Sequence, residues 1–335
     1  MTAKRKKVLK RIGYSFLIII LLFIIAAFVG IQKFNNALFK ERINYLSYTF
    51  ESTPIHFDWA INKKGEYIEK QAAMIVPAKI ENIPLNFHMQ FDTGAPDSYI
   101  YENDLKSLQA MGLHLKEVEK DEERYVESLE VVLGGNHMKI TMLKVLQGYG
   151  HKFDENDTIS RIGIGTIGSD FLENRVTEID FKNQKIALFK ERPEYMQSMS
   201  GFTSFDFKGR RIMLPVTLNK KNYEFLYDSG CSAFGLITIK SRFNVYTDAN
   251  VEEIKYDAKS WDSSLPIRSK LTEQLFAIGS QNLSLKRVSY IDMYTAMQPL
   301  MTPFTRIGGW LGNQPFNEST LILDTQKEEF IVLKN

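Results

Sequence analysis

Two stretches of the chain decide its fold: MIVPAKIENIPLNFHMQFDTGA, residues 74–95, and RIMLPVTLNKKNYEFLYDSGC, residues 211–231. Each begins with an apolar run around a proline, passes a polar turn and continues as a second alternating strand. Alternation of apolar and polar residues predicts half-buried β-strands. Each second strand ends in an aromatic residue followed by Asp, a hydroxyl residue and Gly. Because the same unit occurs twice, the chain contains an internal repeat.

The segments downstream of these stretches repeat as well. Residues 164–189 and 308–333 each contain an apolar-Gly pair, a short amphipathic segment, a strand ending in Asp, a polar turn and a final apolar strand. Helical periodicity is scarce, and residues 102–115 are the best helical candidate. We therefore expect a mainly β fold built from two related β-barrel-like lobes.

The paired Asp-hydroxyl-Gly loops are the candidate site. One such tripeptide is usually a solvated turn, but two at the same place in a repeated unit are not explained by turn composition. In each, the hydroxyl can bond neighbouring backbone, and Gly permits close backbone approach. The candidate residues are Asp92, Thr93, Gly94 and Ala95 in the first loop and Asp228, Ser229, Gly230 and Cys231 in the second.

These loops and the apolar-Gly elements that follow them resemble the active sites of pepsin-like aspartic peptidases. The spelling Asp-Thr-Gly-Ala and Ile-Gly-x-Asp-Phe-Leu is closer to the retroviral-type subunit, so residues 71–335 resemble two such subunits fused. The resemblance implies a bilobal pepsin-like fold with a peptide cleft between the lobes and one catalytic carboxyl in each, Asp92 and Asp228. It also implies supporting loops at Ile167–Gly168 and Leu311–Gly312, and a flap for which Tyr125 is the candidate; the alternative for Tyr125 is an exposed hairpin residue with no catalytic part.

The resemblance implies an aspartic endopeptidase, in which two close carboxyls share a proton and serve as base and acid toward water and the peptide. The pepsin pattern has a hydroxyl residue after each Gly, whereas this chain has Ala95 and Cys231. With less hydrogen bonding to the ionised pair, we expect a pH optimum less acidic than that of pepsin. The alternative function is a catalytically silent extracytoplasmic peptide-binding module. The presence of both Asp residues favours the enzyme.

The N-terminus predicts a membrane anchor. The first eleven residues hold six of the 42 Lys and Arg residues and no acid, leaving 36 basic against 40 acidic residues beyond them. Residues 12–31 are apolar and would form a helix about 30 Å long, enough to span a bilayer. By the positive-inside rule, the N-terminus is cytoplasmic and the catalytic domain extracytoplasmic, at the cell membrane. A cleaved signal peptide is the alternative, although the apolar run is long for one.

The expected organisation has five parts. A basic cytoplasmic tail (1–11) is followed by a transmembrane helix (12–31), a stalk or pro-segment-like linker (32–70), an N-terminal catalytic lobe (71–195) and a C-terminal catalytic lobe (196–335). We expect the protein to be a monomer whose partners are the membrane and a peptide or protein substrate.

Other functional classes lack support in the sequence. The acidic excess beyond the N-terminal tail argues against nucleic-acid binding. No HExxH, CxxC, EF-hand or phosphate-binding motif occurs, so we expect no metal and no cofactor. The spacing around Ser232 is Gly-x-Ser-x-x-Gly and departs from the serine-hydrolase elbow.

Overall fold

The computed structural model describes residues 26, 28–30, 32, 33, 36–50, 54–64, 67–153, 156, 158–260, 263–293 and 307–334. The chain forms two compact units, Met1–Glu41 and Arg42–Asn335. In the first unit, the described residues between 26 and 38 are helical. No helix among the described residues is long and apolar enough to cross a membrane. The predicted anchor, residues 12–31, and the basic tail lie largely outside the described residues.

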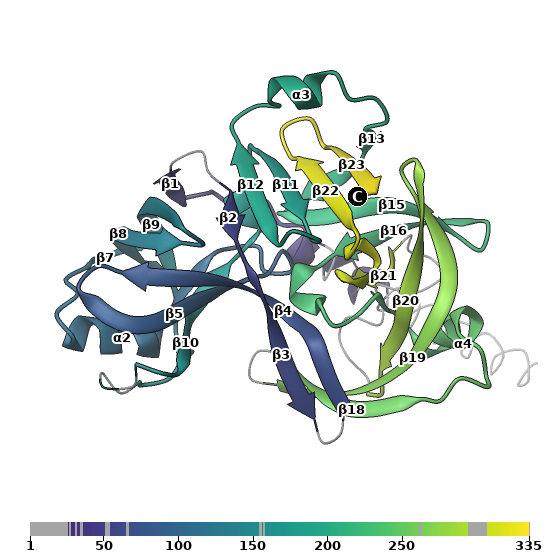
Figure 1. Ribbon diagram of the computed structural model, residues 1–335, viewed down its shortest axis with the longest axis horizontal. Helices are drawn as coiled ribbons and strands as arrows, with labels where there is room; N and C mark the ends of the chain where they lie inside the picture. Colours follow the sequence, from purple (N-terminus) through teal and green to yellow (C-terminus); the bar gives the residue numbers. More distant parts are fainter. Residues whose placement is uncertain are drawn as a thin grey trace, which may run out of the picture. The chain divides into compact units, whose positions relative to one another are not determined.

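The second unit is mainly β, as the sequence predicts, and its described strands form three sheets (Figure 1). The first sheet comes from the first half of the chain. Its strand order is β1-β9-β6-β10-β5-β4-β8-β7, β3 pairs with β4, and β8 also pairs with β9, which closes the sheet on itself. The strands are β1 (Ser47–Phe50), β3 (Asp58–Lys64), β4 (Tyr67–Ile80), β5 (Ile83–Phe91), β6 (Tyr99–Tyr101), β7 (Lys116–Lys120), β8 (Glu123–Leu133), β9 (Asn136–Leu146) and β10 (Arg161–Ile167).

A second sheet comes from the second half of the chain and repeats the topology of the first, apart from β1, which has no counterpart among the described strands. Its order is β14-β15-β16-β21-β17-β20-β19-β18, and it closes through pairing of β15 with β19. The strands are β14 (Asp206–Lys208), β15 (Arg211–Leu218), β16 (Lys221–Tyr227), β17 (Leu236–Ile237), β18 (Ile254–Ser260), β19 (Ser263–Ile278), β20 (Gln281–Ile291) and β21 (Ile307–Leu311). The repeat read in the sequence is therefore a repeat of strand pairing: β4, β5 and β10 correspond to β15, β16 and β21.

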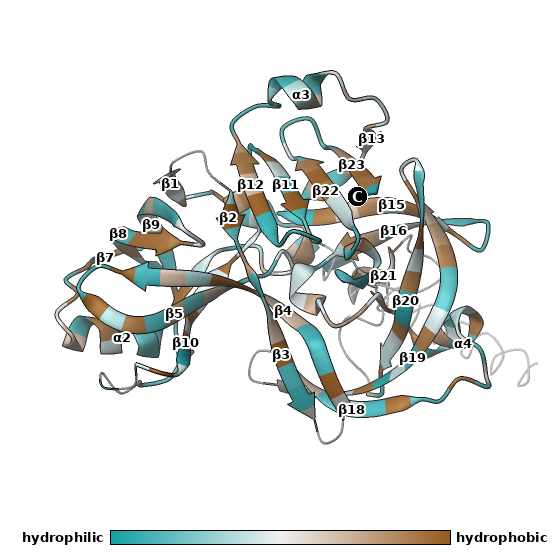
Figure 2. Ribbon diagram, viewed as in Figure 1, coloured by the Kyte–Doolittle hydropathy of each residue, from teal (hydrophilic) through white to brown (hydrophobic). Residues whose placement is uncertain are grey.

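The third sheet takes strands from both halves. Its order is β13-β23-β22-β11-β12-β2, with β11 and β22 antiparallel at its centre. Figure 2 shows hydrophobic residues along β12 and β22, in keeping with the full burial of β22. The strands are β2 (Ile55–His56), β11 (Val176–Asp180), β12 (Lys185–Phe189), β13 (Thr203–Ser204), β22 (Ser319–Asp324) and β23 (Glu329–Lys334).

Helices are short. The predicted helical stretch 102–115 is helical over its first nine residues and then ends in a turn. The predicted boundary between the lobes, 195/196, falls inside α3, after β12 and before β13. Among the described residues of the second unit, the helices are α2 (Glu102–Ala110), α3 (Glu194–Gln197) and α4 (Lys240–Tyr246), with the 3₁₀ turns η1 (Ser169–Leu172), η2 (Ser229–Cys231) and η4 (Gln314–Phe316).

The linker expected over residues 32–70 is shorter than predicted. Strands β1, β2 and β3 all lie within that range, and each pairs with a later part of the chain. Ile55 and Phe57 are buried in the core. Because strands β1, β2 and β3 pair with the sheets, the described residues of these strands are part of the folded body.

Local sequence explains the two hairpins that matter most. In β5, the residues from Ile83 to Phe91 alternate between buried and more exposed positions, so one face of the strand packs in the core. In the turn between β15 and β16, Asn219 and Lys220 both have positive φ. Two-residue turns of that kind match the right-handed twist of the flanking strands. In each half, the second strand of the hairpin therefore ends directly before the candidate loop, which begins at Asp92 or at Asp228.

Candidate active site

The two candidate loops follow corresponding strands. Asp92 comes directly after β5, which pairs in parallel with β10, and Asp228 comes directly after β16, which pairs in parallel with β21. The Asp92 N–H donates to the Ile167 carbonyl at 2.9 Å, and the Asp228 N–H donates to the Leu311 carbonyl at 2.9 Å. The predicted supporting elements therefore hold the first residue of each loop by its backbone.

The loops are interlocked by the two hydroxyl residues, Thr93 and Ser229. The Thr93 N–H donates to Ser229 Oγ, and the Ser229 N–H donates to Thr93 Oγ1, both at 2.9 Å. Thr93 Oγ1 donates to the Tyr227 carbonyl at 3.3 Å, and Ser229 Oγ donates to the Phe91 carbonyl at 3.0 Å. Both hydroxyl residues are fully buried. Four hydrogen bonds thus join strand ends that are 136 residues apart in sequence.

The glycines let the two carboxyls approach each other. A Cβ added at Gly94 would overlap the carboxyl group of Asp228, and a Cβ added at Gly230 would overlap that of Asp92. Each glycine also donates its N–H to the Asp of its own loop, at 2.9 Å in both cases. Any larger residue at either position would force the carboxyls apart.

The pair of carboxyls is electrostatically coupled. Both side chains are half-buried. The pKa of Asp92 is raised well above its ordinary value, mainly by burial and secondly by the nearby negative charge of Asp228. Two carboxyls held in this way retain one proton between them at a pH where an isolated Asp is ionised. The site can therefore present a carboxylate and a carboxylic acid side by side.

The residues after the glycines differ between the loops. Cys231 Sγ donates to Asp228 Oδ2 at 3.1 Å, whereas Ala95 is buried and offers no side-chain donor. Burial, together with the adjacent Asp228, raises the pKa of the Cys231 thiol well above its ordinary value. The thiol therefore stays protonated and can donate. The second loop replaces the expected hydroxyl with a weaker donor, and the first does not replace it.

The supporting glycines are close to the backbone of the loops. A Cβ at Gly168 would overlap the carbonyls of Asp97 and Ala95, and a Cβ at Gly312 would overlap that of Cys231. Neither glycine has a positive φ. They are needed for close packing and not for backbone conformation.

Sequence reasoning missed the residues that follow these glycines. Ser169 Oγ donates to the Thr93 carbonyl at 2.7 Å, and Asn313 Nδ2 donates to the Ser229 carbonyl at 3.3 Å. Both side chains are fully buried. The signal was available, because both occupy the same position in the repeated unit, directly after the apolar-Gly pair.

The flap candidate Tyr125 is not at a hairpin tip. It lies on β8, and the turn between β7 and β8 is formed by Asp121 and Glu122, both with positive φ. Its ring packs edge-on against Tyr45, with ring centroids 5.5 Å apart, and Tyr45 donates its hydroxyl to Asp121 at 2.7 Å. The tip of this hairpin is therefore acidic, and the tyrosine is a buried strand residue below it.

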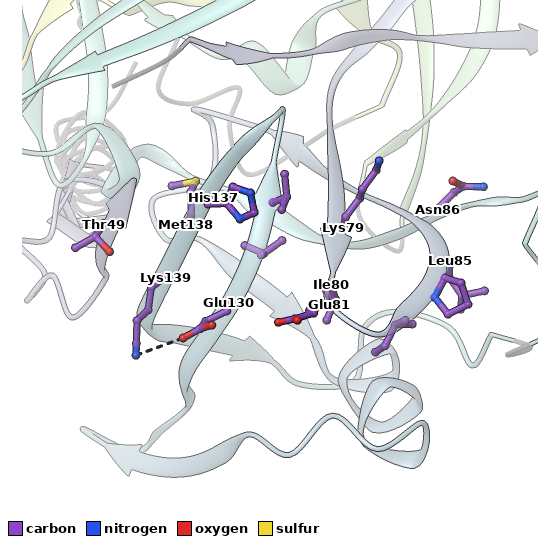
Figure 3. Close-up of a pocket in the computed structure, with 14 residues that line it drawn as sticks. Thr49, Lys79, Ile80, Glu81, Leu85, Asn86, Glu130, His137, Met138 and Lys139 are labelled. Carbon is purple, nitrogen blue, oxygen red and sulfur yellow. Dashed lines mark ion pairs between the residues drawn. The ribbon is translucent and has the colours of Figure 1, made fainter. Parts of the chain in front are cut away.

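A cavity of about 920 Å³ lies elsewhere, at the end of β5 opposite to the Asp92 loop (Figure 3). Apolar residues from the β4–β5 turn and from β8 and β9 line it, together with charged residues such as Lys79 and Glu130. It contains no residue of the paired loops. Among the described residues, no cluster of three or more His, Cys, Asp or Glu side chains could hold a metal ion.

Compared with protein-family models and with curated proteins, the chain matches none.

Proposed function

We propose that this chain is a membrane-anchored aspartic endopeptidase with a bilobal pepsin-like fold, in which Asp92 and Asp228 activate water to hydrolyse a peptide bond. One observation carries the proposal: two topologically equivalent loops are interlocked by Thr93 and Ser229 so that each carboxyl lies against the glycine of the other loop. The two closed sheets of the same topology support the bilobal fold.

The chemistry follows from the carboxyl pair. The carboxylate takes a proton from water as the water oxygen bonds to the peptide carbonyl carbon, and the carboxylic acid gives its proton to the carbonyl oxygen. Collapse of the resulting tetrahedral diol breaks the C–N bond: the nitrogen leaves with a proton from the pair, and one diol hydroxyl gives its proton back to the pair as the new C=O bond forms. One water is consumed, and the products are a carboxylic acid and an amine. Neither a covalent intermediate nor a cofactor is required.

Position at the membrane is part of the proposal. The six basic residues before the apolar run at 12–31 favour a cytoplasmic N-terminus, with the carboxyl pair outside the cytoplasm. We propose a monomer, because each half of the chain supplies one of the two loops and a single chain completes the pair. Substrates would be peptides or proteins near that membrane face.

The test uses the full chain in detergent micelles with a peptide library from pH 3 to pH 8. We expect cleavage by the wild type and loss of at least about 1,000-fold in kcat/KM in Asp92→Asn and in Asp228→Asn, because each substitution removes one of the two roles. Asp248→Asn changes an exposed carboxyl after α4 and is the matched control. Absence of cleavage by the wild type would favour the silent peptide-binding module. Activity that survives either substitution in the pair would exclude the aspartic mechanism.

A further inference from the structure

The second loop has a positively charged neighbour across its hairpin. In the antiparallel pair β15–β16, Ile212 is opposite Tyr227. The next residues outward are Arg211, the first residue of β15, and Asp228, the first residue after β16. The Arg211 guanidinium is near the Asp228 carboxyl, because it donates to the Gly94 carbonyl and Gly94 lies against that carboxyl.

The hairpin of the first loop has no basic residue at the corresponding position. In β4–β5, Met74 is opposite Phe91, so the residue that stands opposite Asp92 is Ala73. The two hairpins are copies of one unit, but this position is Ala73 in the first copy and the positively charged Arg211 in the second. Otherwise similar loops therefore meet with unequal electrostatic surroundings.

Arg211 has few partners of its own. Its guanidinium donates to the carbonyl of Gly94, in the opposite loop. Its Nε atom is buried without a hydrogen-bond partner in the part of the chain that the structure describes. Among those residues it also forms no ion pair with a carboxylate within 4.0 Å, and Asp228 and Asp92 are the negative charges that act on it. A guanidinium keeps its charge at any ordinary pH. Its field therefore falls on the carboxyl pair.

The thiol of Cys231 adds to the same asymmetry. Its Sγ donates to Asp228 Oδ2, whereas the corresponding residue of the first loop, Ala95, has no side-chain donor and acts on Asp92 through its backbone N–H alone. A hydrogen bond to the charged form of a carboxyl favours that form. Both differences between the loops therefore stabilise negative charge on Asp228.

The remaining ionisable groups in this corner do not oppose that charge. The Tyr227 hydroxyl is neutral, because burial raises its pKa well above the ordinary value, and it donates to Asn313. Arg42 also acts on Arg211, but it pairs with Asp97 at 3.2 Å. Tyr99, the other neighbour of Arg211, has its pKa raised chiefly by burial, so it too is neutral.

We propose that Arg211 is a positioning residue that holds the negative charge of the pair on Asp228. Asp228 then takes the proton from the attacking water, and Asp92 carries the proton that goes to the substrate carbonyl oxygen. This inference rests on the proposed peptidase function and assigns the two roles that the function alone leaves interchangeable.

The experiment measures the pH dependence of kcat/KM on an uncharged peptide for the full chain. In Arg211→Gln the acidic limb of the profile moves up by about one pH unit, because Asp228 loses a nearby positive charge and takes up its proton more readily. Arg211→Lys keeps the charge and restores most of the wild-type limb. Arg161→Gln removes an exposed guanidinium at the opposite end of β10 and leaves the limb where it was.

Two results would overturn the proposal. An acidic limb that does not move in Arg211→Gln excludes the electrostatic role. A KM increase confined to peptides with a carboxylate, with the limb unmoved, assigns Arg211 to substrate binding instead. Two peptides then show which substrate carboxylate is bound. One has a Glu side chain and an amidated C-terminus, and the other has Gln in place of that Glu and a free C-terminal carboxylate.

A second measurement does not depend on turnover. The ¹³C carboxyl resonances of Asp92 and Asp228, assigned with the Asp→Asn variants, are followed against pH in wild type and Arg211→Gln. We expect the resonances to show the shared proton on Asp92 in the wild type and to show it more evenly shared between the two carboxyls in the variant. If the wild type cleaves nothing, the proposed function fails, while this titration still decides the role of Arg211.

Discussion

At the residue scale, the site depends on two hydroxyls, each of which makes two hydrogen bonds to the backbone of the opposite half. Ser229 Oγ accepts from the Thr93 N–H and donates to the Phe91 carbonyl, in a region closed to water. Buried backbone groups that lose a partner cost about 1–3 kcal/mol each. The interlock is therefore a stabilising device as well as a positioning one, and its loss is measurable without any substrate.

Ser229→Ala tests this directly. We expect the free energy of unfolding to fall by about 2–4 kcal/mol, since the Thr93 N–H and the Phe91 carbonyl both lose a buried partner. Urea unfolding of the full chain measures it. Ser204→Ala, at an exposed position of β13, changes the same atoms at the surface and should stay within about 0.5 kcal/mol of wild type. Equal effects of the two substitutions would show that the interlock contributes nothing to stability.

The residues of the paired loops could be predicted because the repeat marks them twice. Arg211 could not, although it occupies an equally repeated position. Its importance depends on the register of β15 with β16 and on a contact with Gly94, 117 residues away. Its counterpart, Ala73, gives no chemical signal. Comparison of the two copies identifies residues that are alike in both, such as the paired Asp residues. A difference between the copies, such as Arg211 against Ala73, can be interpreted only when the strand pairing is known.

At the scale of elements, helix α2 carries a carboxyl in an apolar setting. Asp104 is 1% exposed and accepts a hydrogen bond from the His151 N–H at 3.2 Å. Burial raises its pKa to about 6, although this hydrogen bond acts in the opposite direction. A carboxyl whose pKa is higher in the folded state than in the unfolded state favours folding at low pH. That contribution is lost as the pH rises from about 4 to about 6.

Asp104→Asn should remove this dependence. The amide oxygen still accepts from the His151 N–H, but it does not ionise. Relative to wild type, the free energy of unfolding of the variant should therefore rise by about 1–2 kcal/mol between pH 4 and pH 7, after allowance for solvent screening. Urea unfolding at the two pH values gives the difference. Glu130→Gln, at an exposed position of β8, is the control. The idea fails if the two variants follow the same pH dependence.

Strand pairing outside the repeat was harder to predict than strand pairing within it. Strands β4, β5, β15 and β16 have clear alternation and a second copy. Strands β1 to β3 have neither, and β2 has only two residues. Such a strand is held by its neighbours, here β12, and not by its own pattern. The predicted linker therefore ended too late in the chain.

At the scale of the whole folded body, the two halves are joined at more than the paired loops. Strands β11 and β22 form the centre of a sheet shared by both halves. In addition, Glu69 of β4 pairs with Arg287 of β20 at 2.7 Å, and both side chains are largely buried. Arg287 also donates to the Ala233 carbonyl, beside the second loop. We therefore expect the halves to unfold together.

The Glu69–Arg287 pair allows that coupling to be measured. Removing one partner of a buried ion pair leaves the other charge without compensation and costs about 3–5 kcal/mol. We expect Glu69→Ala and Arg287→Met each to lose stability on that scale, and the double variant to lose less than the sum. Urea unfolding followed by tryptophan fluorescence and by far-UV circular dichroism provides both the energies and the cooperativity. Additive losses would mean that the pair is not a link, and two separate transitions in the wild type would mean that the halves fold independently. The fluorescence and circular-dichroism transitions could instead coincide in the wild type and separate only in the single variants. That result would show that this ion pair helps to couple the unfolding of the two halves. Because each half supplies one loop, the same contact would then help to hold the carboxyl pair together.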